Sequence, residues 1–295
     1  MQDADPAAER NCAVTGATGY LGSRLCESLA ARGWNVFRLT RRPAGDDAHQ
    51  VPFSLNAGAP ADFFGRHRIR SLVHCSWDFR FHRWSDIEAQ NVQGSIRLLR
   101  QAHEQGVSRI VFISTMSAFP GCKSLYGRAK LAVEREAAAL GAIVVRPGLI
   151  YGERPGGMVG ALTKAVRSLP LVPLIGDGRQ MLYAIHEDDL ATLVERLISG
   201  SDLPAGPVIA ACERGLTFRQ VLETLAARDG RRPKFLPVPW RLIWAPLRLA
   251  EAGRLPLKFR SDSVISLVNQ DPHPDFAATR ALGVVLRDFR AGSNG

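Results

Sequence analysis

Short apolar stretches alternate with longer stretches that carry apolar residues at helical spacing through the first half of the chain. Strands are expected at residues 11–15, 35–40, 71–75, 109–114 and 142–146, and helices at residues 21–32, 85–105 and 126–140. In the first helix Leu21, Leu25 and Leu29 fall on one face, and Gly33 ends the pattern. This alternation predicts βαβ units and therefore a doubly wound parallel sheet of the α/β class.

The pattern changes after residue 152, where Pro and Gly become frequent. Amphipathic stretches at residues 158–168, 188–199 and 217–228 are joined by irregular connections. We therefore expect a first domain at residues 1–152, with segments around 181–200 returning to it. A smaller, mostly α-helical region at residues 153–295 would bind the substrate and fold against the carboxyl ends of the strands.

Residues 240–252 (WRLIWAPLRLAEA) form an amphipathic stretch that is rich in Trp. Such a stretch is compatible with a helix on a membrane surface. The preferred interpretation is core or pocket wall, because Pro246 interrupts the segment.

Composition narrows the classes further. Hydrophobic residues make up 46% and charged residues 22% of 295 residues, which excludes disordered, collagenous and coiled-coil chains. The longest stretch without Asp, Glu, Lys or Arg has 14 residues (48–61), fewer than the roughly 20 that a transmembrane helix needs. The first 11 residues lack the apolar core of a signal peptide and the five cysteines are scattered, so a cytoplasmic location is expected.

The chain is strongly basic, with a formal net charge of +10. This charge favours an anionic cofactor or substrate. Nucleic-acid binding would require a basic stripe with interleaved aromatic residues or a known module, and the sequence shows neither. No grouping of His and Cys has the spacing of a metal site.

Three glycines recur where the first expected strand meets the first helix, in TGATGYLG at residues 15–22. Glycine allows the tight turn and lets the backbone approach a pyrophosphate, which the free N–H groups of the helix N-terminus bind. The strand before and the helix after it satisfy the context of a dinucleotide site. The candidate cofactor residues in this loop are Gly16, Thr18, Gly19, Tyr20, Leu21 and Gly22.

The end of the second expected strand indicates which dinucleotide binds. An acidic residue there would hold a ribose 2′-hydroxyl, but the chain has Arg41 and Arg42. Two cations favour the 2′-phosphate of NADP, with NAD as the alternative. The competing interpretation is that both arginines are solvated surface charges.

Tyr126 and Lys130 lie four residues apart in YGRAK, at the start of an expected helix. This spacing places them on one face of the helix. A neighbouring ammonium favours the phenolate and would move the pKa of the phenol toward the working range of an acid/base catalyst.

Six segments in chain order resemble the extended short-chain dehydrogenases/reductases, which include nucleotide-sugar epimerases, dehydratases and ketoreductases. They are TGATGYLG at 15–22, NVQG at 91–94, IST at 113–115, YGRAK at 126–130, RPGLIYG at 146–152 and IHEDDL at 185–190. The resemblance covers residues 11 to 190. Beyond residue 201 it is limited to the general texture of the sequence. It implies a Rossmann-type sheet and nicotinamide chemistry.

The resemblance also implies roles for single residues. Tyr126 would be the acid/base, and Lys130 would hold the nicotinamide ribose and lower the pKa of Tyr126. Thr115 would bond the substrate oxygen, with Ser114 and Ser117 as alternatives.

Asn91 is a further catalytic candidate that would order the site. Cys75, Pro147 and Gly148 are the remaining candidate cofactor contacts. These assignments rest on the resemblance alone.

The chain departs from the family pattern in the substrate and adenine regions. The connection between Thr115 and Tyr126 is short, and FSLN at 53–56 replaces the adenine-contacting Asp of the family. Leu182 stands where the nucleotide-sugar enzymes commonly carry an Arg. The cations that would replace it are Arg154, Arg179, Lys258 and Arg260.

Together these observations predict an NADP-dependent oxidoreductase that moves a hydride between the cofactor and a ketone or alcohol carbon. A sugar-nucleotide 4-ketoreductase or dehydrogenase acting on an anionic small molecule is the first expectation. The alternatives are a nucleotide-sugar epimerase with tightly bound cofactor and a non-catalytic NADP-binding sensor or assembly subunit. A homodimer is compatible with the resemblance.

Overall fold

The computed structural model describes residues 10–45, 47–153, 156–200, 204–253, 255 and 259–290. At its centre lies a seven-stranded sheet in the order β11-β6-β5-β4-β1-β2-β3, in which all neighbours pair in parallel. The strands are β1 (Asn11–Thr15), β2 (Asn35–Thr40), β3 (Gln50–Pro52), β4 (Ser71–His74), β5 (Arg109–Ile113), β6 (Ile143–Pro147) and β11 (Val208–Ala210). The expected Rossmann-type α/β fold is confirmed.

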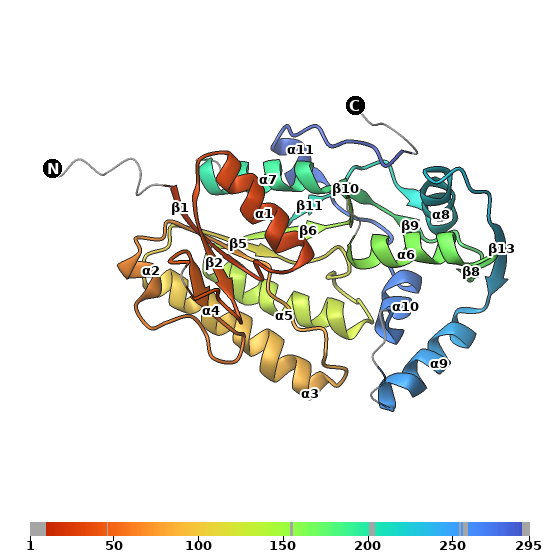
Figure 1. Cartoon of the computed structure of the whole chain (residues 1–295), viewed down its shortest axis with the longest axis horizontal. Helices are drawn as coiled ribbons and strands as arrows, with labels where there is room; N and C mark the ends of the chain where they lie inside the picture. Colours follow the sequence, from red (N-terminus) through yellow and green to blue (C-terminus); the bar gives the residue numbers. More distant parts are fainter. Residues whose placement is uncertain are drawn as a thin grey trace.

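Helices cover both faces of this sheet (Figure 1). On one face lie α1 (Tyr20–Ala31), α7 (Glu187–Ser199) and α11 (Ala277–Ala281). The other face carries α2 (Phe63–Arg66), α3 (Trp84–Ile87), the π-helical turn η2 (Glu88–Val92), α4 (Gln93–Glu104) and α5 (Leu125–Ala139).

The central strands have apolar residues at successive positions because both of their faces are buried. In β1, Cys12 and Val14 pack toward α1 and α7, whereas Ala13 packs toward α4 and α5. In β5, Val111 and Phe112 divide between the two cores in the same way. The alternation follows from the two-residue period of a strand.

The strand order reverses between β1 and β4, since the chain runs outward from β1 through β2 to β3 and then returns to β4. A crevice opens at such a switch point, outside the carboxyl ends of the strands, and ligands of doubly wound proteins bind there. The fold therefore places the glycine loop after β1 and the segment after β4 beside the same crevice.

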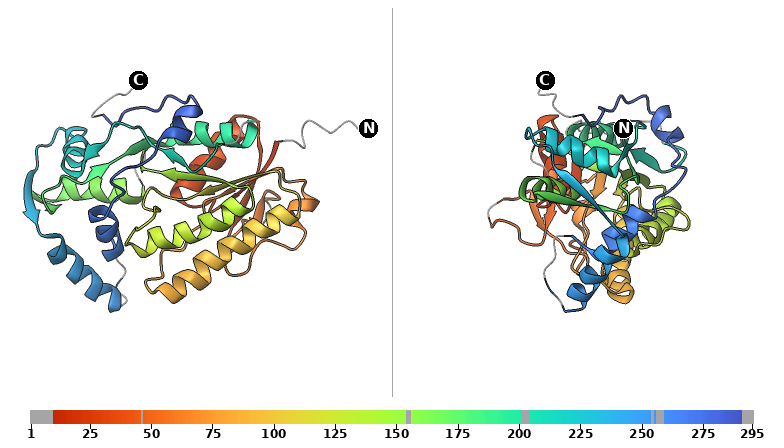
Figure 2. Two further views of the ribbon diagram at one scale, coloured as in Figure 1. Left: turned by 180° about the vertical axis from the view of Figure 1, so that it is seen from behind. Right: turned by 90° about the vertical axis from the view of Figure 1, so that its right-hand side faces the viewer.

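A second region packs around its own core beside this sheet (Figure 2). Its helices are α6 (Gly157–Ser168), α8 (Phe218–Ala227), α9 (Trp240–Ala252) and α10 (Ser261–Val268). Its strands are β7 (Leu149–Tyr151), β8 (Leu171–Ile175), β9 (Met181–Leu182), β10 (Ala184–His186), β12 (Leu216–Thr217) and β13 (Lys234–Val238). They form three two-stranded sheets, β7 with β10, β8 with β13 and β9 with β12.

The chain leaves the large sheet after β6 and later returns to it. Helix α7 packs on α1, and β11 pairs with β6 at the edge of the sheet. Helix α7 and strand β11 thus belong to the first region, although they follow elements of the second region in the chain. The division into a cofactor domain and a substrate region remains our proposal.

Candidate active site

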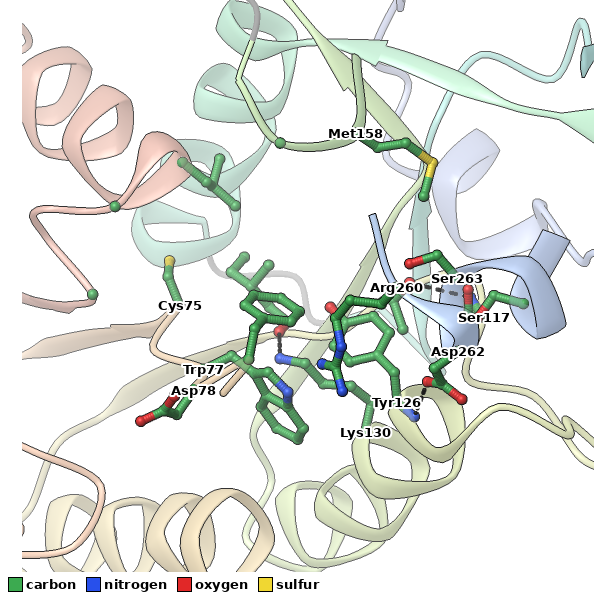
Figure 3. A pocket seen from close by; sticks show the side chains of 18 of the residues that line it. Cys75, Trp77, Asp78, Ser117, Tyr126, Lys130, Met158, Arg260, Asp262 and Ser263 are labelled. Carbon is green, nitrogen blue, oxygen red and sulfur yellow. Dashed lines mark hydrogen bonds between the residues drawn. The ribbon is translucent and has the colours of Figure 1, made fainter. Parts of the chain in front are cut away.

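A cavity of about 2070 Å³ runs along the carboxyl end of the sheet, from the glycine loop to α9 and α10 (Figure 3). It brings together most of the site residues expected from the sequence. Those that line it are Gly16, Thr18, Gly19, Tyr20, Leu21, Gly22, Arg41, Cys75, Ser114, Thr115, Ser117, Tyr126, Lys130, Pro147 and Gly148. Arg42 and Asn91 are not among its lining residues.

The glycine loop is packed too closely for side chains. Gly16 has a φ of +67°, and a Cβ there would lie 3.1 Å from the backbone of Ser76. A Cβ on Gly22 would lie 2.2 Å from the carbonyl oxygen of Gly16. Helix α1 begins after Gly19 without a side-chain cap or an acidic residue in its first turn, so its N–H groups suit a pyrophosphate.

Tyr20 ties the glycine loop to the start of α7. Its hydroxyl donates a hydrogen bond to Glu187 at 2.7 Å, and Arg24 pairs with the same buried carboxylate at 3.1 Å. A Cβ on Gly156 would lie 2.5 Å from the Tyr20 ring, so the ring fits only against glycine. The sequence pattern did not indicate that Glu187 has this partner.

A buried network holds the segment after β4 against the glycine loop. The Thr15 hydroxyl oxygen accepts hydrogen bonds from the backbone N–H groups of Cys75 and Ser76 at 3.1 Å and lies 2.7 Å from Nδ1 of His74. The other ring nitrogen of His74 lies 2.9 Å from the Ser95 hydroxyl. Burial, helped by the charge of Lys130, lowers the pKa of His74 to about 3, so the ring is neutral.

Tyr126 lies in the first turn of α5, whose N-terminus is capped by Ser124 through a hydrogen bond from the Gly127 N–H at 3.1 Å. Burial raises the pKa of Tyr126 above its ordinary value, and a hydrogen bond with the Thr115 side chain acts in the opposite direction. The phenol is therefore protonated at neutral pH. Its hydroxyl partner is Thr115, the residue expected to bond the substrate oxygen.

Ser114 has a different partner. Its hydroxyl donates to Glu134, and Arg146 donates to both oxygens of that carboxylate at 3.0 and 2.6 Å. This buried ion pair leaves Thr115 and Ser117 as the hydroxyls open to a substrate. It also gives Arg146 a structural role.

Lys130 is buried and donates a hydrogen bond to the carbonyl oxygen of Ile113 at 2.7 Å. Its Nζ lies 4.2 Å from the ring centroid of Trp77 and 4.6 Å from that of Phe112, a cation–π arrangement. Burial lowers the pKa of Lys130 to about 7. Since the ammonium is then only partly charged at neutral pH, the lowering of the Tyr126 pKa by Lys130 remains a prediction.

The segment after β4 supplies aromatic residues that motif reasoning did not identify. The Trp77 ring meets the Tyr126 ring edge-on at 5.7 Å, and the Phe79 ring lies 5.6 Å from it. Asn91, in the π-helical turn, accepts from the Asp78 N–H at 2.7 Å and donates to the Asp78 carbonyl oxygen at 2.9 Å. Asn91 thus positions this segment, and the alternating aromatic residues of WDFRFHRW at 77–84 were the available signal.

Asp262 of α10 caps the helix that carries Tyr126. Its two carboxylate oxygens accept hydrogen bonds from the backbone N–H groups of Leu125 at 2.8 Å and Tyr126 at 2.9 Å. A carboxylate at a helix N-terminus is favoured by the helix dipole. The second region therefore contacts the first turn of α5 directly (Figure 3).

The expected cations differ in whether they line the cavity. Arg41 lines it and, with the nearer Arg80, lowers the pKa of Asp78. Arg42 is exposed outside the lining. Leu182, which stands where the nucleotide-sugar enzymes commonly carry an Arg, also lines the cavity.

Of the four replacement cations, Arg260 lines the cavity, whereas Arg179 is exposed beside Asp177 and is not among the lining residues. Arg154 and Lys258 lie outside the described residues. The Arg260 guanidinium donates to the Phe81 carbonyl oxygen at 2.7 Å and contacts His82 at 2.8 Å. Its buried Nε has no hydrogen-bond partner within the described part of the chain.

Two features are absent from the described residues. They contain no group of three or more His, Cys, Asp or Glu side chains that would hold a metal ion. Among them there is also no helix with the length and hydropathy needed to cross a membrane.

A phenol and an ammonium on one turn of a helix, in a cavity shared with a pyrophosphate loop, define an enzyme of the short-chain dehydrogenase/reductase type. Comparison with known proteins agrees with this class. The chain belongs to the NAD dependent epimerase/dehydratase family, whose model matches residues 12–209.

Three similar proteins illustrate the range of the family. Ceramide reductase of Caulobacter vibrioides is 26% identical over 239 residues, which cover 77% of this chain and 73% of the relative. UDP-glucose 4-epimerase of Vibrio cholerae is 25% identical over 267 residues, with 78% of each chain covered. The solved structure of MoeE5 in complex with UDP-glucuronic acid and NAD has a TM-score of 0.65 and 24% identity, covering 78% of this chain and 85% of that one.

Proposed function

We propose that this chain is an NADP-dependent oxidoreductase that transfers a hydride between the cofactor and a ketone or alcohol carbon. The observation that carries the proposal is that Thr115, Tyr126 and Lys130 line the same cavity as the glycine loop. The cofactor, when bound, supplies or accepts the hydride. The chain supplies orientation and the proton.

Each residue would have a separate task. The N–H groups at the start of α1 would bind the pyrophosphate, and the hydroxyl of Thr115 would donate a hydrogen bond to the substrate oxygen. The Oη of Tyr126 would donate a proton to that oxygen. Because burial keeps this phenol protonated at neutral pH, the environment favours the reductive direction.

NADP rather than NAD is the proposed cofactor because Arg41 lines the cavity and no acidic residue follows β2 directly. A guanidinium would bind a 2′-phosphate through charge-assisted hydrogen bonds. The solved relative described above was crystallised with NAD, which supports a nicotinamide dinucleotide of either kind.

Two substrate chemistries are supported by the names of relatives. A sugar-nucleotide ketone, reduced by a 4-ketoreductase or interconverted by an epimerase, corresponds to the UDP-glucose 4-epimerase. A lipid carbonyl corresponds to the ceramide reductase. A reductase consumes NADPH in proportion to product, whereas an epimerase needs only catalytic cofactor. A cytoplasmic location and a homodimer complete the proposal.

The test measures NADPH oxidation by the purified protein with sugar-nucleotide ketones, keto-lipids and short water-soluble ketones. We expect oxidation with at least one class, and Tyr126→Phe should reduce the rate by about 100-fold or more while it retains NADPH affinity. Lys123→Met, an exposed residue near the start of the same helix, is the control. Normal turnover by Tyr126→Phe would show that Tyr126 is not the acid/base.

A further inference from the structure

The outer face of α9 exposes a stripe of apolar side chains. One face of this helix, with Trp240, Ile243, Trp244 and Leu247, packs against the core of the second region. On the opposite face Leu242 is 65% and Leu249 is 74% exposed. Since helical residues three and four apart are neighbours, Leu242, Ala245, Pro246 and Leu249 form one continuous line, which we call the α9 stripe.

Helix α9 lies at the periphery of the molecule, and α10 is its main packing partner (Figures 1 and 2). Contiguous exposed apolar side chains mark interaction sites more often than scattered ones do. We therefore expect a partner to bind the α9 stripe.

The charges beside the stripe favour an anionic occupant. Arg241 and Arg248 are exposed on one flank of it, about two turns apart along the helix. An amphipathic helix with apolar side chains on one face and flanking arginines binds anionic lipid surfaces. A second copy of this chain would carry the same net charge of +10 and would be less complementary.

The stripe borders the mouth of the cavity. Leu249 belongs to the stripe and also lines the cavity, together with Leu255, which is 58% exposed, and Phe259. The lining also includes Phe79, which is 55% exposed, and Met158, which is 37% exposed. An apolar chain that leaves a lipid surface at α9 would thus meet an apolar rim.

A polar anchor lies inside this rim. Arg260 lines the same cavity as Tyr126, and its buried Nε has no hydrogen-bond partner within the described residues. A hydrogen-bond acceptor in the polar part of an amphiphile would satisfy it. With about 2070 Å³, the cavity exceeds the roughly 300–1,000 Å³ of a typical ligand pocket and has room for both a dinucleotide and such a molecule.

We propose that the α9 stripe binds an anionic lipid surface and that the cavity takes from it an amphiphilic keto-lipid. The proposal rests on the proposed function and names its substrate class. The carbonyl carbon gains the hydride of NADPH and the carbonyl oxygen gains the proton of Tyr126, so ketone, NADPH and H⁺ give a secondary alcohol and NADP⁺. The polar part faces Arg260 and the apolar chain extends toward Leu249 and Leu255.

The first arm of the test is sedimentation of the full chain with vesicles of phosphatidylglycerol and phosphatidylcholine, and of phosphatidylcholine alone. The test variant is Arg241→Glu/Leu242→Glu, since neither residue lines the cavity. The control, Arg70→Glu/Val285→Glu, makes the same change of charge at two exposed positions away from α9. We expect binding to the anionic vesicles, lost at least tenfold in the test variant and retained in the control.

The second arm measures NADPH oxidation with a keto-lipid embedded in the anionic vesicles and with a short water-soluble ketone. The test variant should lose about tenfold in kcat/KM on the embedded lipid and retain its rate on the soluble ketone, which also shows that it is folded. Equal loss on both substrates would overturn the docking proposal.

The remaining outcomes separate this proposal from the proposed function. A wild-type chain that reduces a sugar nucleotide or soluble ketone but ignores the vesicles would overturn the lipid proposal and leave the oxidoreductase assignment intact. Vesicle binding without any NADPH oxidation would overturn the assignment instead. A dimer that dissociates in Arg241→Glu/Leu242→Glu would identify the stripe as a contact between copies and overturn the lipid surface.

Discussion

The two ends of the cavity differ in how far apart in the sequence their interacting residues lie. At the glycine-loop end, the close backbone contact between Gly16 and Gly22 joins residues six positions apart. At the α9 end, Asp262 bonds Leu125 across 137 positions and Arg260 bonds Phe81 across 179. At the glycine-loop end, which we propose is the cofactor end, the turn itself is therefore set by local sequence, although Tyr20 also bonds the distant Glu187. The α9 end, which we propose is the substrate end, depends on how the second region packs against the first.

Tyr126 lies between the two ends and is held by both. Its helix packs on the central sheet through Ala129 and Val133, while its first turn is capped from α10 by Asp262. The position of Tyr126, the proposed acid/base, thus depends both on the central sheet and on the second region. Perturbing each end separately tests this difference.

The largest expected effect is acid destabilisation through His74, which holds the segment after β4. Its pKa is lowered to about 3, below the ordinary value of 6.5, so the unfolded chain takes up a proton first as the pH falls. Stability is complete above pH 6.5 and decreases toward pH 3, by about 4 kcal/mol for a shift of this size. Urea unfolding at a series of pH values measures this slope.

The variant His74→Asn removes the titrating group and should have a shallower slope over this range, whatever its stability at neutral pH. His103→Asn, at an exposed position, should keep the wild-type slope. Parallel slopes for wild type and His74→Asn would show that another group causes the loss.

The next effect concerns the glycine loop itself. Gly22→Ala would place a Cβ 2.2 Å from the Gly16 carbonyl oxygen, so the loop or the start of α1 must shift. We expect NADPH affinity to fall about 100-fold, or about 2.7 kcal/mol, by fluorescence titration. Gly65→Ala, in α2 with no atom within 4 Å of its Cβ, should bind NADPH like wild type, and an equal affinity for Gly22→Ala would refute the tight loop.

The same division explains what the sequence predicted of the fold. Strands β1 and β2 have the expected bounds because they are apolar runs bounded by turns and buried on both faces. The strands of two to five residues in the second region were not predicted, since such short runs show no clear period. The amphipathic stretch expected at residues 240–252 coincides with α9, but core or pocket wall was its preferred interpretation, and its exposed outer face follows only from the packing.

The candidate site shows the same difference between local and long-range contacts. Motifs located the glycine loop, Thr115, Tyr126 and Lys130, because each is set by a strand end or one helix turn. They did not reveal Trp77 over Lys130, Glu187 under Tyr20 or the cap by Asp262, since those contacts join segments distant in sequence. Asn91 was expected to help order the site, and its contacts hold the backbone of Asp78.

A smaller effect is expected at Asp262, which caps the helix that carries Tyr126. Asp262→Ala removes both acceptors from the first turn of α5, a change comparable to the loss of a helix cap, about 1 kcal/mol. We expect kcat to fall about tenfold, because Tyr126 loses its position, whereas the Kd for NADPH stays constant. Asp262→Asn retains one acceptor and should recover part of kcat.

Asp177→Asn, an exposed residue that does not line the cavity, serves as the matched control. A variant Asp262→Ala that loses thermal stability but keeps its kcat would show that the cap supports the fold alone. Equal losses in kcat and NADPH affinity would place its effect at the cofactor end.

The smallest effect separates Arg41 from Arg42, which are adjacent in sequence but differ in position. Arg41 lines the cavity and Arg42 does not. Because Arg41 is exposed, its contact with a 2′-phosphate is screened by water, and Arg41→Gln should weaken NADPH binding by about threefold, or about 0.7 kcal/mol. NADH lacks this phosphate and should bind Arg41→Gln and wild type alike.

Arg42→Gln is the matched control, with the same change of charge one residue away. If it weakens NADPH binding as much as Arg41→Gln does, the preference arises from the general positive field and not from a contact inside the cavity. If neither variant distinguishes NADPH from NADH, the cofactor end does not select the 2′-phosphate through β2. Selectivity would then depend on residues that close the adenine side from farther along the chain, and this part of the cofactor end would resemble the substrate end.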